Sequence, residues 1–189
     1  MNDHKPRCAF CLKDPLYIAY HDEEWSAPLH QEERHFEMLL LETMQAGLNW
    51  WTILRRREGF RRAFADFDAV KIALFNEEDV HRLLQNSDII RHEGKIRAAI
   101  QNAQVFEKIQ TLWGSYDAFI WSFTDGAVIS STWETAPAAR SALSERVNKA
   151  MRQLGFVFVG SVTVQAYLQA IGVLHEHWSG CFLAPENAK

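Results

Sequence analysis

The sequence predicts an all-α protein, and two observations support this fold class. Apolar side chains recur every three or four residues in several segments, as the buried face of a helix requires, and Ile96, Ala99 and Ile100 within 93–112 are the clearest example. Only the short run 156–159 has a β-like composition, and no partner strand for it is evident. We therefore expect helices joined by short loops.

The predicted helices follow one another after an irregular opening segment. A strongly apolar helix begins near Glu32 and ends at Gly47, because glycine favours a helix C-terminus. Asn76 and the acids after it suit the start of a short helix, which a turn separates from the longer one, so that 79–112 is a helix-hairpin-helix candidate. The other expected elements are helices at 50–57, 60–67, 115–123, 141–154 and 161–174 and a loop at 130–138.

The composition suits one domain, 1–189, built as two helical lobes. Of the 189 residues 48% are hydrophobic, which is enough for a full core without disulfides. No apolar stretch is long enough to span a bilayer, and the first residues lack the apolar segment of a signal peptide. The three cysteines do not form a disulfide framework. We therefore expect a cytoplasmic protein with free thiols.

The charge is balanced overall but uneven along the chain. A formal net charge of −4 argues against a strongly electrostatic nucleic-acid binder. Arginines nevertheless crowd 55–62, and basic residues recur at 91–97. Such runs are usually solvated surfaces, and the alternative is that they contact phosphates.

Cysteine and histidine residues lie near both ends of the chain. The first candidates are Cys8, His21, His177 and Cys181. One thiolate–imidazole pair from each end would complete a tetrahedral zinc site, which would be structural because it leaves no open position. Cys8-x-x-Cys11 is itself a zinc-knuckle spacing, and His4 and His175 are further candidates. The plain alternative is a set of buried thiols and surface histidines without a metal.

A carboxylate inside the most apolar helix indicates a binding pocket. Glu42 lies in the run 39–44, where an ionised side chain is costly unless it is paired. If the opening segment packs on this helix, four electron-rich rings would surround it: Tyr17, Tyr20, Trp25 and Trp50. Rings attract positive charge through their faces, so a flat cationic ligand such as a methylated purine would fit. The alternatives are an ordinary aromatic core and a Glu42 on a wetter helix edge.

A series of motifs covers nearly the whole chain. The longest is Asp14–Asp22, Asp-Pro-Leu-Tyr-Ile-Ala-Tyr-His-Asp, and it is highly specific. The others are Arg7-Cys8, Trp25, Gln45-Ala-Gly-Leu48 with Trp50, Ile89-Ile-Arg-His92 with Lys95-Ile96, Trp121-Ser-Phe123, Gly155-Phe156 with Phe158-Val-Gly160, and His177 with Gly180-Cys181. In this order the motifs resemble those of the DNA-3-methyladenine glycosylase I family.

The resemblance implies a helix-hairpin-helix glycosylase fold in which zinc joins the two ends of the chain. It gives the ligand roles to the four first candidates and leaves Cys11 and His175 at non-ligand positions. Asp88 departs from the family pattern, which usually has glycine in a hairpin whose amides hold a DNA phosphate. Aspartate tolerates turn geometry, so the fold should persist, but its carboxylate would repel a phosphate unless it is turned away.

The resemblance also implies an activity. The protein would flip 3-methyladenine out of alkylated double-stranded DNA, acting as a monomer, and hydrolyse the N-glycosidic bond to leave a free base and an abasic site. Glu42 is the expected recognition and catalytic carboxylate, with the four rings shaping the pocket; no catalytic aspartate is implied, and Asp125 is the other carboxylate considered. The residues expected to contact DNA are Gly47, Leu48, Arg91 and Lys95.

Two other functions are compatible with the residues. A zinc-stapled DNA-binding module would recognise damage without releasing a base. A zinc hydrolase would need an open coordination position for water, against which four protein ligands argue.

Overall fold

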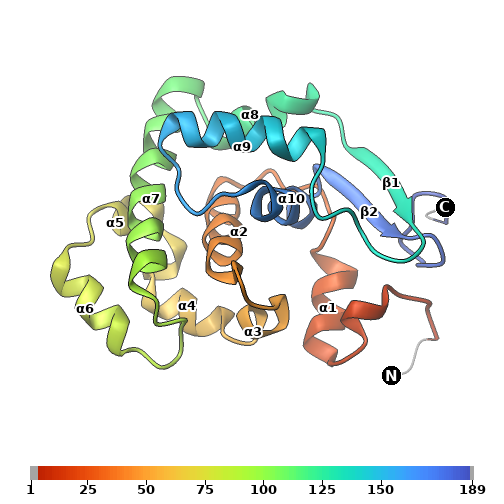
Figure 1. The fold of residues 1–189 in the computed structure, drawn as a ribbon, viewed down its shortest axis with the longest axis horizontal. Coiled ribbons are helices and arrows are strands. Elements are labelled where there is room, and N and C mark those ends of the chain that lie inside the picture. The colour runs from red at the N-terminus through yellow and green to blue at the C-terminus, as the bar shows by residue number, and fades with distance from the viewer. Residues whose placement is uncertain (1–3, 188–189) are drawn as a thin grey trace.

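The computed structural model describes residues 4–187, and it is predominantly helical, as the sequence predicts. Helix α2 (Glu32–Gln45) lies at the centre and packs against both α7 (Glu93–Trp113) and α10 (Ser161–Ala170). Figure 1 also shows that the first and last segments of the chain lie on the same side of the molecule. Within the described residues no helix is long and apolar enough to cross a bilayer.

The other helices are shorter and closely spaced. They are α1 (Pro15–Glu23), α3 (Trp50–Leu54), α4 (Arg57–Ala63), α5 (Ala69–Ala73), α6 (Glu77–Gln85), α8 (Tyr116–Trp121) and α9 (Ala142–Leu154), with 3-10 turns at Ala9–Cys11, Ala65–Phe67 and Ser122–Thr124. The helix expected at 60–67 ends at Ala63, because the backbone of Phe64 leaves helical geometry with φ −110° and ψ 45°.

Side-chain caps explain where several helices begin. The Asp14 carboxylate accepts a hydrogen bond from the Leu16 amide at 2.9 Å, and Pro15 fills the first helical position of α1. Asn76 forms a reciprocal capping box with Asp79 at the start of α6, so the start signal recognised in the sequence is confirmed. Gly155 ends α9 in the left-handed conformation, also as predicted.

Two parallel strands depart from the all-α prediction. Strand β1 (Ile129–Trp133) pairs with β2 (Leu174–Trp178), with Ile129 opposite Leu174. The expected loop at 130–138 is therefore wrong in its first part, and the helix expected at 161–174 ends at Ala170. The β-like run 156–159 is not a strand. Pairing with a distant segment, which a local pattern does not encode, decides which runs become strands.

Helix α2 is buried on almost every side. Ten of its fourteen residues are buried, so the helix forms the middle of the core and not an amphipathic surface helix. Two of the buried residues are acids. Glu37 accepts hydrogen bonds of 2.8 Å from both Arg57 and Arg61, whereas no arginine or lysine pairs with Glu42 among the described residues. The same buried helix thus holds one paired and one unpaired carboxylate.

Gly172 lets the chain turn from α10 into β2, and its replacement tests this close approach. It has φ +70°, and a Cβ on it would lie 2.3 Å from the carbonyl carbon of Ala27. We expect Gly172→Ala to lower the free energy of unfolding by about 3 kcal/mol or more, measured by urea denaturation. Gly114→Ala is the control. Gly114 has φ +83°, and a Cβ on it would meet no other described part of the chain within 4 Å, so only the backbone cost of about 1–2 kcal/mol remains. Equal losses would contradict the clash.

Candidate functional site

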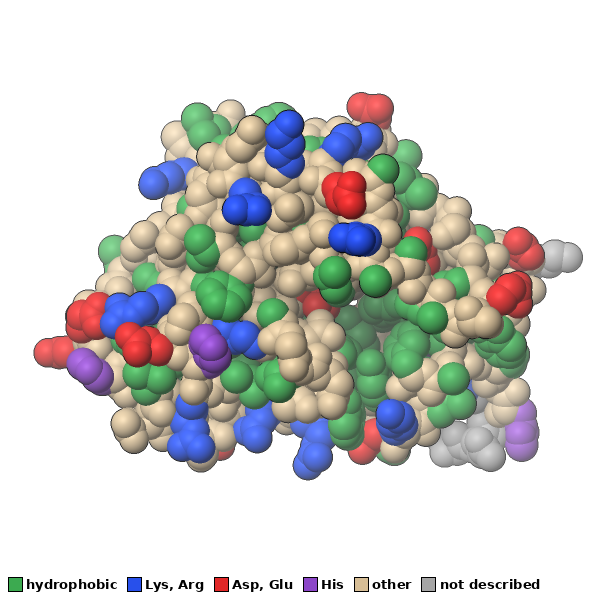
Figure 2. Space-filling model, viewed as in Figure 1, with side chains coloured by type: hydrophobic (Ala, Val, Ile, Leu, Met, Phe, Trp, Pro, Cys, Tyr) green, Lys and Arg blue, Asp and Glu red, His purple; other side chains and the backbone are tan. Residues whose placement is uncertain are grey.

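A cavity of about 230 Å³ opens between α1, α2, α3 and α10. Its lining is Phe10, Tyr17, Tyr20, Trp25, Glu42, Gln45, Trp50, Pro137, Ala166 and Gln169. Figure 2 shows a hollow with hydrophobic walls in this part of the molecule, right of the centre of the view. All five pocket residues expected from the sequence therefore meet at one cavity.

Glu42 is the acidic residue of this cavity. Only 4% of its surface is exposed, and its Oε2 atom has no hydrogen-bond partner within residues 4–187. Burial raises the pKa of Glu42 to about 8. The Trp50 Nε1 atom is likewise buried without an acceptor in this part of the chain. An unpaired acceptor and an unpaired donor that line the same cavity indicate a place for a polar, ring-shaped ligand.

The aromatic rings around Glu42 support one another. The Tyr20 and Trp50 ring centroids are 5.2 Å apart, and Tyr17 stacks on Trp51 at 5.8 Å with 5° between the planes. Burial, with a smaller effect of the charges on Cys11 and Glu42, raises the pKa of Tyr17 to about 12. Its hydroxyl is therefore neutral at pH 7 and can donate a hydrogen bond. Trp51, which the sequence analysis did not single out, is the outer layer of this wall.

Half of the lining was not recognised in the sequence. Gln45 had a usable signal, because it follows Glu42 by three residues and so shares its face of α2. Pro137 had none, since it comes from the loop after β1, whose position depends on the pairing with β2. Asp125, the other carboxylate considered for catalysis, is exposed in a turn and does not line the cavity.

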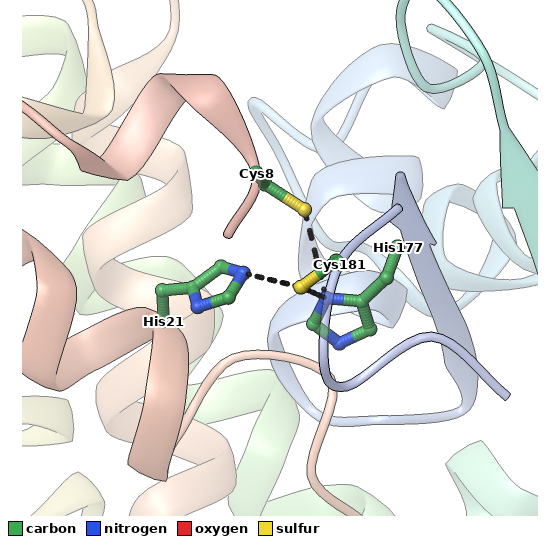
Figure 3. Close-up of side chains that lie close together, drawn as sticks. All are labelled: Cys8, His21, His177 and Cys181. Carbon is green, nitrogen blue, oxygen red and sulfur yellow. Dashed lines mark hydrogen bonds between the residues drawn. The ribbon is translucent and has the colours of Figure 1, made fainter. Parts of the chain in front are cut away.

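Four cysteine and histidine side chains from the two ends of the chain meet in a buried cluster, shown in Figure 3. They are Cys8, His21, His177 and Cys181, none of which is exposed, and their ligand atoms all lie within 4.8 Å of one another. Cys181 Sγ lies 3.6 Å from both His21 Nε2 and His177 Nδ1, and Cys8 Sγ lies 3.7 Å from His177 Nδ1. Such a cluster could hold a metal ion.

The surroundings of the cluster orient its ligands. His21 Nδ1 lies 2.8 Å from the Asp22 carboxylate, to which Arg7 donates two hydrogen bonds from Nε and one from Nη2. When His21 Nδ1–H donates to the Asp22 carboxylate, the lone pair of Nε2 faces Cys181 Sγ. The Trp178 amide donates to Cys8 Sγ at 3.4 Å. The hydrogen bond from the Cys8 thiol lowers the pKa of Cys181, which favours its thiolate.

Cys11 and His175 lie outside the cluster, although both are close. The Cys11 thiol donates to the carbonyl of Cys8 at 3.1 Å. The His175 ring bonds the carbonyl groups of Ser26 and Leu183, each at 3.0 Å. Neither residue belongs to the group of four whose side chains could hold a metal ion. This placement agrees with the non-ligand positions that the resemblance implies.

The cluster and the cavity share a wall. His21 lies on α1, the helix that also carries Tyr17 and Tyr20. The Trp25 ring, which lines the cavity, lies edge-on to His177 at 4.9 Å and stacks on His21 at 5.9 Å. Fixing the cluster therefore fixes one side of the cavity.

Three of the four residues expected to contact DNA are exposed. Gly47 and Leu48 form the tip of the turn after α2, where Leu48 is 43% exposed, and Arg91 is also exposed. Lys95 differs from the expectation. It is 5% exposed, and its Nζ atom donates to the carbonyls of Met44 at 2.8 Å and Ala46 at 2.6 Å. Its ammonium group is thus directed into the protein, where it holds the base of this turn.

The structure defines a helical protein with an aromatic cavity that contains the Glu42 carboxylate, and comparison with known proteins specifies the family. Residues 10–184 match the profile of the methyladenine glycosylases, so the chain belongs to the methyladenine glycosylase family. The family and the enzyme class expected from the sequence are thereby confirmed.

Two relatives and one solved structure illustrate the similarity. The chain is 42% identical to DNA-3-methyladenine glycosylase 1 of Escherichia coli over 184 residues, which is 96% of this chain and 98% of the relative. It is 36% identical to the DNA-3-methyladenine glycosylase of Haemophilus influenzae over 180 residues, 93% and 96% of the two chains. A variant of 3-methyladenine DNA glycosylase I in complex with 3-methyladenine superimposes with a TM-score of 0.90 at 35% identity, covering 95% of this chain and 97% of that one.

The raised pKa of Glu42 predicts a pH-dependent loss of stability. Because the folded value of about 8 exceeds the ordinary 4.5, unfolding releases a proton between these two pH values, and the folded state loses stability as the pH rises through them. Glu42→Gln lacks this titration. We expect the stability of the variant relative to the wild type to grow by up to about 5 kcal/mol between pH 4.5 and 9, measured by urea denaturation. A stability difference for Glu42→Gln that does not change with pH would refute the buried, unpaired carboxylate.

Proposed function

We propose that this chain, acting as one glycosylase domain and as a monomer, flips 3-methyladenine out of double-stranded DNA and hydrolyses its N-glycosidic bond. The observation that carries the proposal is the unpaired carboxylate of Glu42 in an aromatic cavity, in a chain of this family. Flipping costs a few kcal/mol, least for a damaged base whose stacking and pairing are already weakened. The cavity of about 230 Å³ offers space for a single purine base.

Recognition of the base depends on its charge. Methylation at N3 makes the nucleotide base a cation, and a cation beside Glu42 lowers the pKa of that carboxyl, so binding and ionisation of Glu42 support each other. The faces of Tyr17, Tyr20, Trp25 and Trp50 also attract positive charge. Unmethylated adenine is neutral, so it would either face a protonated Glu42 or leave a buried carboxylate unpaired. Normal DNA is rejected for this reason.

The chemical step needs little acid catalysis from the protein. The bond between C1′ and the base nitrogen breaks, its electron pair passes to the cationic base, and the base leaves as a neutral molecule. Water adds to C1′ and loses a proton. Positive charge therefore moves from the base toward the sugar, and we assign Glu42 to recognition of the first charge and to electrostatic stabilisation of the second. No aspartate within residues 4–187 lines the cavity, which supports a mechanism without a catalytic aspartate.

The turn at Gly47 and Leu48 is the proposed entry into the duplex. The exposed Leu48 side chain would fill the gap that the flipped nucleotide leaves, and Lys95 holds the turn from inside. Helices α6 and α7 with their connection would serve as the helix-hairpin-helix, and Arg91 would contact the backbone of DNA. Asp88 in this connection lies 3.2 Å from the Arg62 guanidinium, which offsets the charge that would otherwise repel a phosphate.

We assign the cysteine–histidine cluster to a structural zinc ion. Zinc–sulfur and zinc–nitrogen bonds of about 2.3 and 2.0–2.1 Å place neighbouring ligand atoms of a tetrahedron about 3.6 Å apart. The sulfur–nitrogen distances of 3.6, 3.6 and 3.7 Å match this spacing. Two thiolates and two imidazoles suit zinc, and four protein ligands leave no position for a reactive water, which disfavours the zinc hydrolase alternative. Zinc when bound would supply no chemistry and would hold α1 against β2.

Release of free base tests the proposed activity and separates it from a DNA-binding module without catalysis. The purified protein is incubated with duplex DNA treated with a methylating agent, and the freed bases are resolved by chromatography. We expect the wild type and the Glu58→Gln control to release 3-methyladenine, and Glu42→Gln to release it roughly 10- to 100-fold more slowly, because one bond to a charged group is lost. Leu48→Ala should also be slower. A folded wild type that binds this DNA but frees no base would favour the binding module.

Metal content tests the zinc assignment. Cys8→Ser removes a ligand, so we expect it to lose its zinc and, with it, at least several kcal/mol of stability. Cys11→Ser is the matched control, because Cys11 lies three residues away and only donates a hydrogen bond to the Cys8 carbonyl. It should keep one zinc per chain and most of its thermal stability. Metal is measured by atomic spectroscopy; loss of zinc from Cys11→Ser and not from Cys8→Ser would show that the ligand set is wrong.

A further inference from the structure

Phe158 is an exposed aromatic residue in an unfavourable backbone conformation. It lies in the connection between α9 and α10 with φ 57°, a left-handed value that a bulky side chain rarely adopts. Phe156, two residues before it, and Val159, directly after it, are both 2% exposed, whereas Phe158 is 43% exposed. The connection therefore anchors two apolar side chains in the core and directs this one ring outward. Strain of this kind persists only where the surrounding structure imposes it, and it often marks a functional position.

Two asparagine side chains impose this conformation. Asn102 on α7, 2% exposed, accepts from the Val157 amide at 2.9 Å and donates to the Val157 carbonyl at 3.1 Å. Asn148 on α9 donates to the Val159 carbonyl. The backbone is thus held immediately before and immediately after Phe158. The connection is therefore fixed by hydrogen bonds to two helices, and the outward position of the Phe158 ring is a defined part of the fold.

The ring lies beside the elements that are proposed to meet DNA. It packs edge-on to His92, the N-cap of α7, with 6.3 Å between ring centroids. A Cβ on Gly94 would lie 3.5 Å from Phe158 Cζ, at ordinary contact distance, so the ring lies against the first turn of α7. The next residue, Lys95, holds the Ala46 carbonyl at the base of the Leu48 turn. Phe158 and Leu48 are therefore linked through the start of α7.

The charge around the ring favours a polyanion as the occupant of this surface. Lys149 and Arg152 are exposed on α9 next to Asn148, and together with it they line a groove. Arg91 is exposed at the start of α7, and the acid in that turn, Glu93, is paired with Arg97 at 2.8 Å. Figure 2 shows Lys and Arg side chains above and below the hollow on this face. Exposed rings on basic surfaces are typical of nucleic-acid contacts, because rings stack on bases and sugars.

We propose that Phe158 is a second apolar contact with DNA, in addition to Leu48. Its ring packs on a deoxyribose or base next to the strand held at the start of α7, and so stabilises the distorted duplex from outside the base cavity. The inference rests on the proposed function, because it takes damaged duplex DNA as the ligand. It adds a contact that acts on DNA binding and leaves recognition of the free base unchanged.

Phe158→Asn is the variant that tests the proposal, because asparagine adopts left-handed backbone more readily than phenylalanine and the ring is removed without new strain. The control is Leu74→Asn, at an apolar side chain that is 77% exposed after α5. The measurements are the affinity for a duplex with a tetrahydrofuran abasic-site analogue at several salt concentrations, the affinity for free 3-methyladenine by tryptophan fluorescence, and thermal unfolding.

We expect Phe158→Asn to bind the abasic duplex about tenfold more weakly than the wild type. The dependence of the affinity on salt should be unchanged, because no charge is removed. Affinity for free 3-methyladenine should match that of the wild type and of Leu74→Asn, and the unfolding temperature should be no lower than that of the wild type, because asparagine relieves backbone strain.

Three outcomes would overturn the proposal. Duplex binding by Phe158→Asn within twofold of the wild type, while the wild type releases base, would remove Phe158 from the interface and leave the proposed function intact. An equal loss of binding to the free base would mean that the ring supports the cavity. A wild type that neither binds the abasic duplex nor releases base would remove the proposed function and this inference with it.

Discussion

The structure depends on the burial of a carboxylate-bearing helix on almost all its sides. Helix α2 carries Glu37 and Glu42 five residues apart, both 4% exposed, and the fold treats them in opposite ways. Two arginines compensate Glu37, whereas no compensating charge pairs with Glu42 within residues 4–187, and burial raises its pKa to about 8. The core thus pairs the acid that does not line the cavity and leaves the cavity acid unpaired. The unpaired acid is the feature that a cationic ligand would satisfy.

The wall opposite this carboxylate is a short helix that is held from both sides. On one side His21 ties α1 to the cysteine–histidine cluster, and Arg7 with Asp22 orients its ring. On the other side Arg57 bridges Glu24, just after α1, to Glu37 on α2, with hydrogen bonds of 2.8 Å to each. Nine residues of helix have little stability of their own. The two attachments therefore place the rings of Tyr17 and Tyr20 against Glu42.

The sequence carried the local information well and the long-range information only where motifs supplied it. Caps such as Asn76 and Gly155 act through neighbouring backbone, so they located helix ends correctly. The pairing of β1 with β2 joins segments more than forty residues apart, and neither strand has a strong alternating pattern. The position of Pro137 at the cavity depends on that pairing, which is why it could not be predicted.

Lys95 shows a different limit of sequence reasoning. A lysine in a basic run is normally solvated, and only the tertiary structure reveals two backbone carbonyls within its reach. The four ligand candidates and five pocket residues nevertheless lie together as expected, because the family motifs indicate their roles and a carboxylate such as Glu42 is costly to bury without a partner. The residue types do not predict how each side chain is placed, and the outward position of the Phe158 ring is an example.

The place of Glu42 on its helix sharpens the selectivity for a cation. Helix α2 ends at Gln45, so Glu42 lies in the last turn, where the aligned peptide dipoles present a negative end. A second negative charge is disfavoured there, and Lys95 on the terminal carbonyls offsets only part of this field. Burial, which raises the pKa of Glu42 to about 8, acts in the same direction and favours the neutral carboxyl at pH 7. A cationic base would compensate both the charge of the Glu42 carboxylate and the negative end of helix α2, whereas a neutral base would compensate neither. Discrimination between methylated and normal adenine therefore arises from the electrostatic field of the cavity and not from its shape alone.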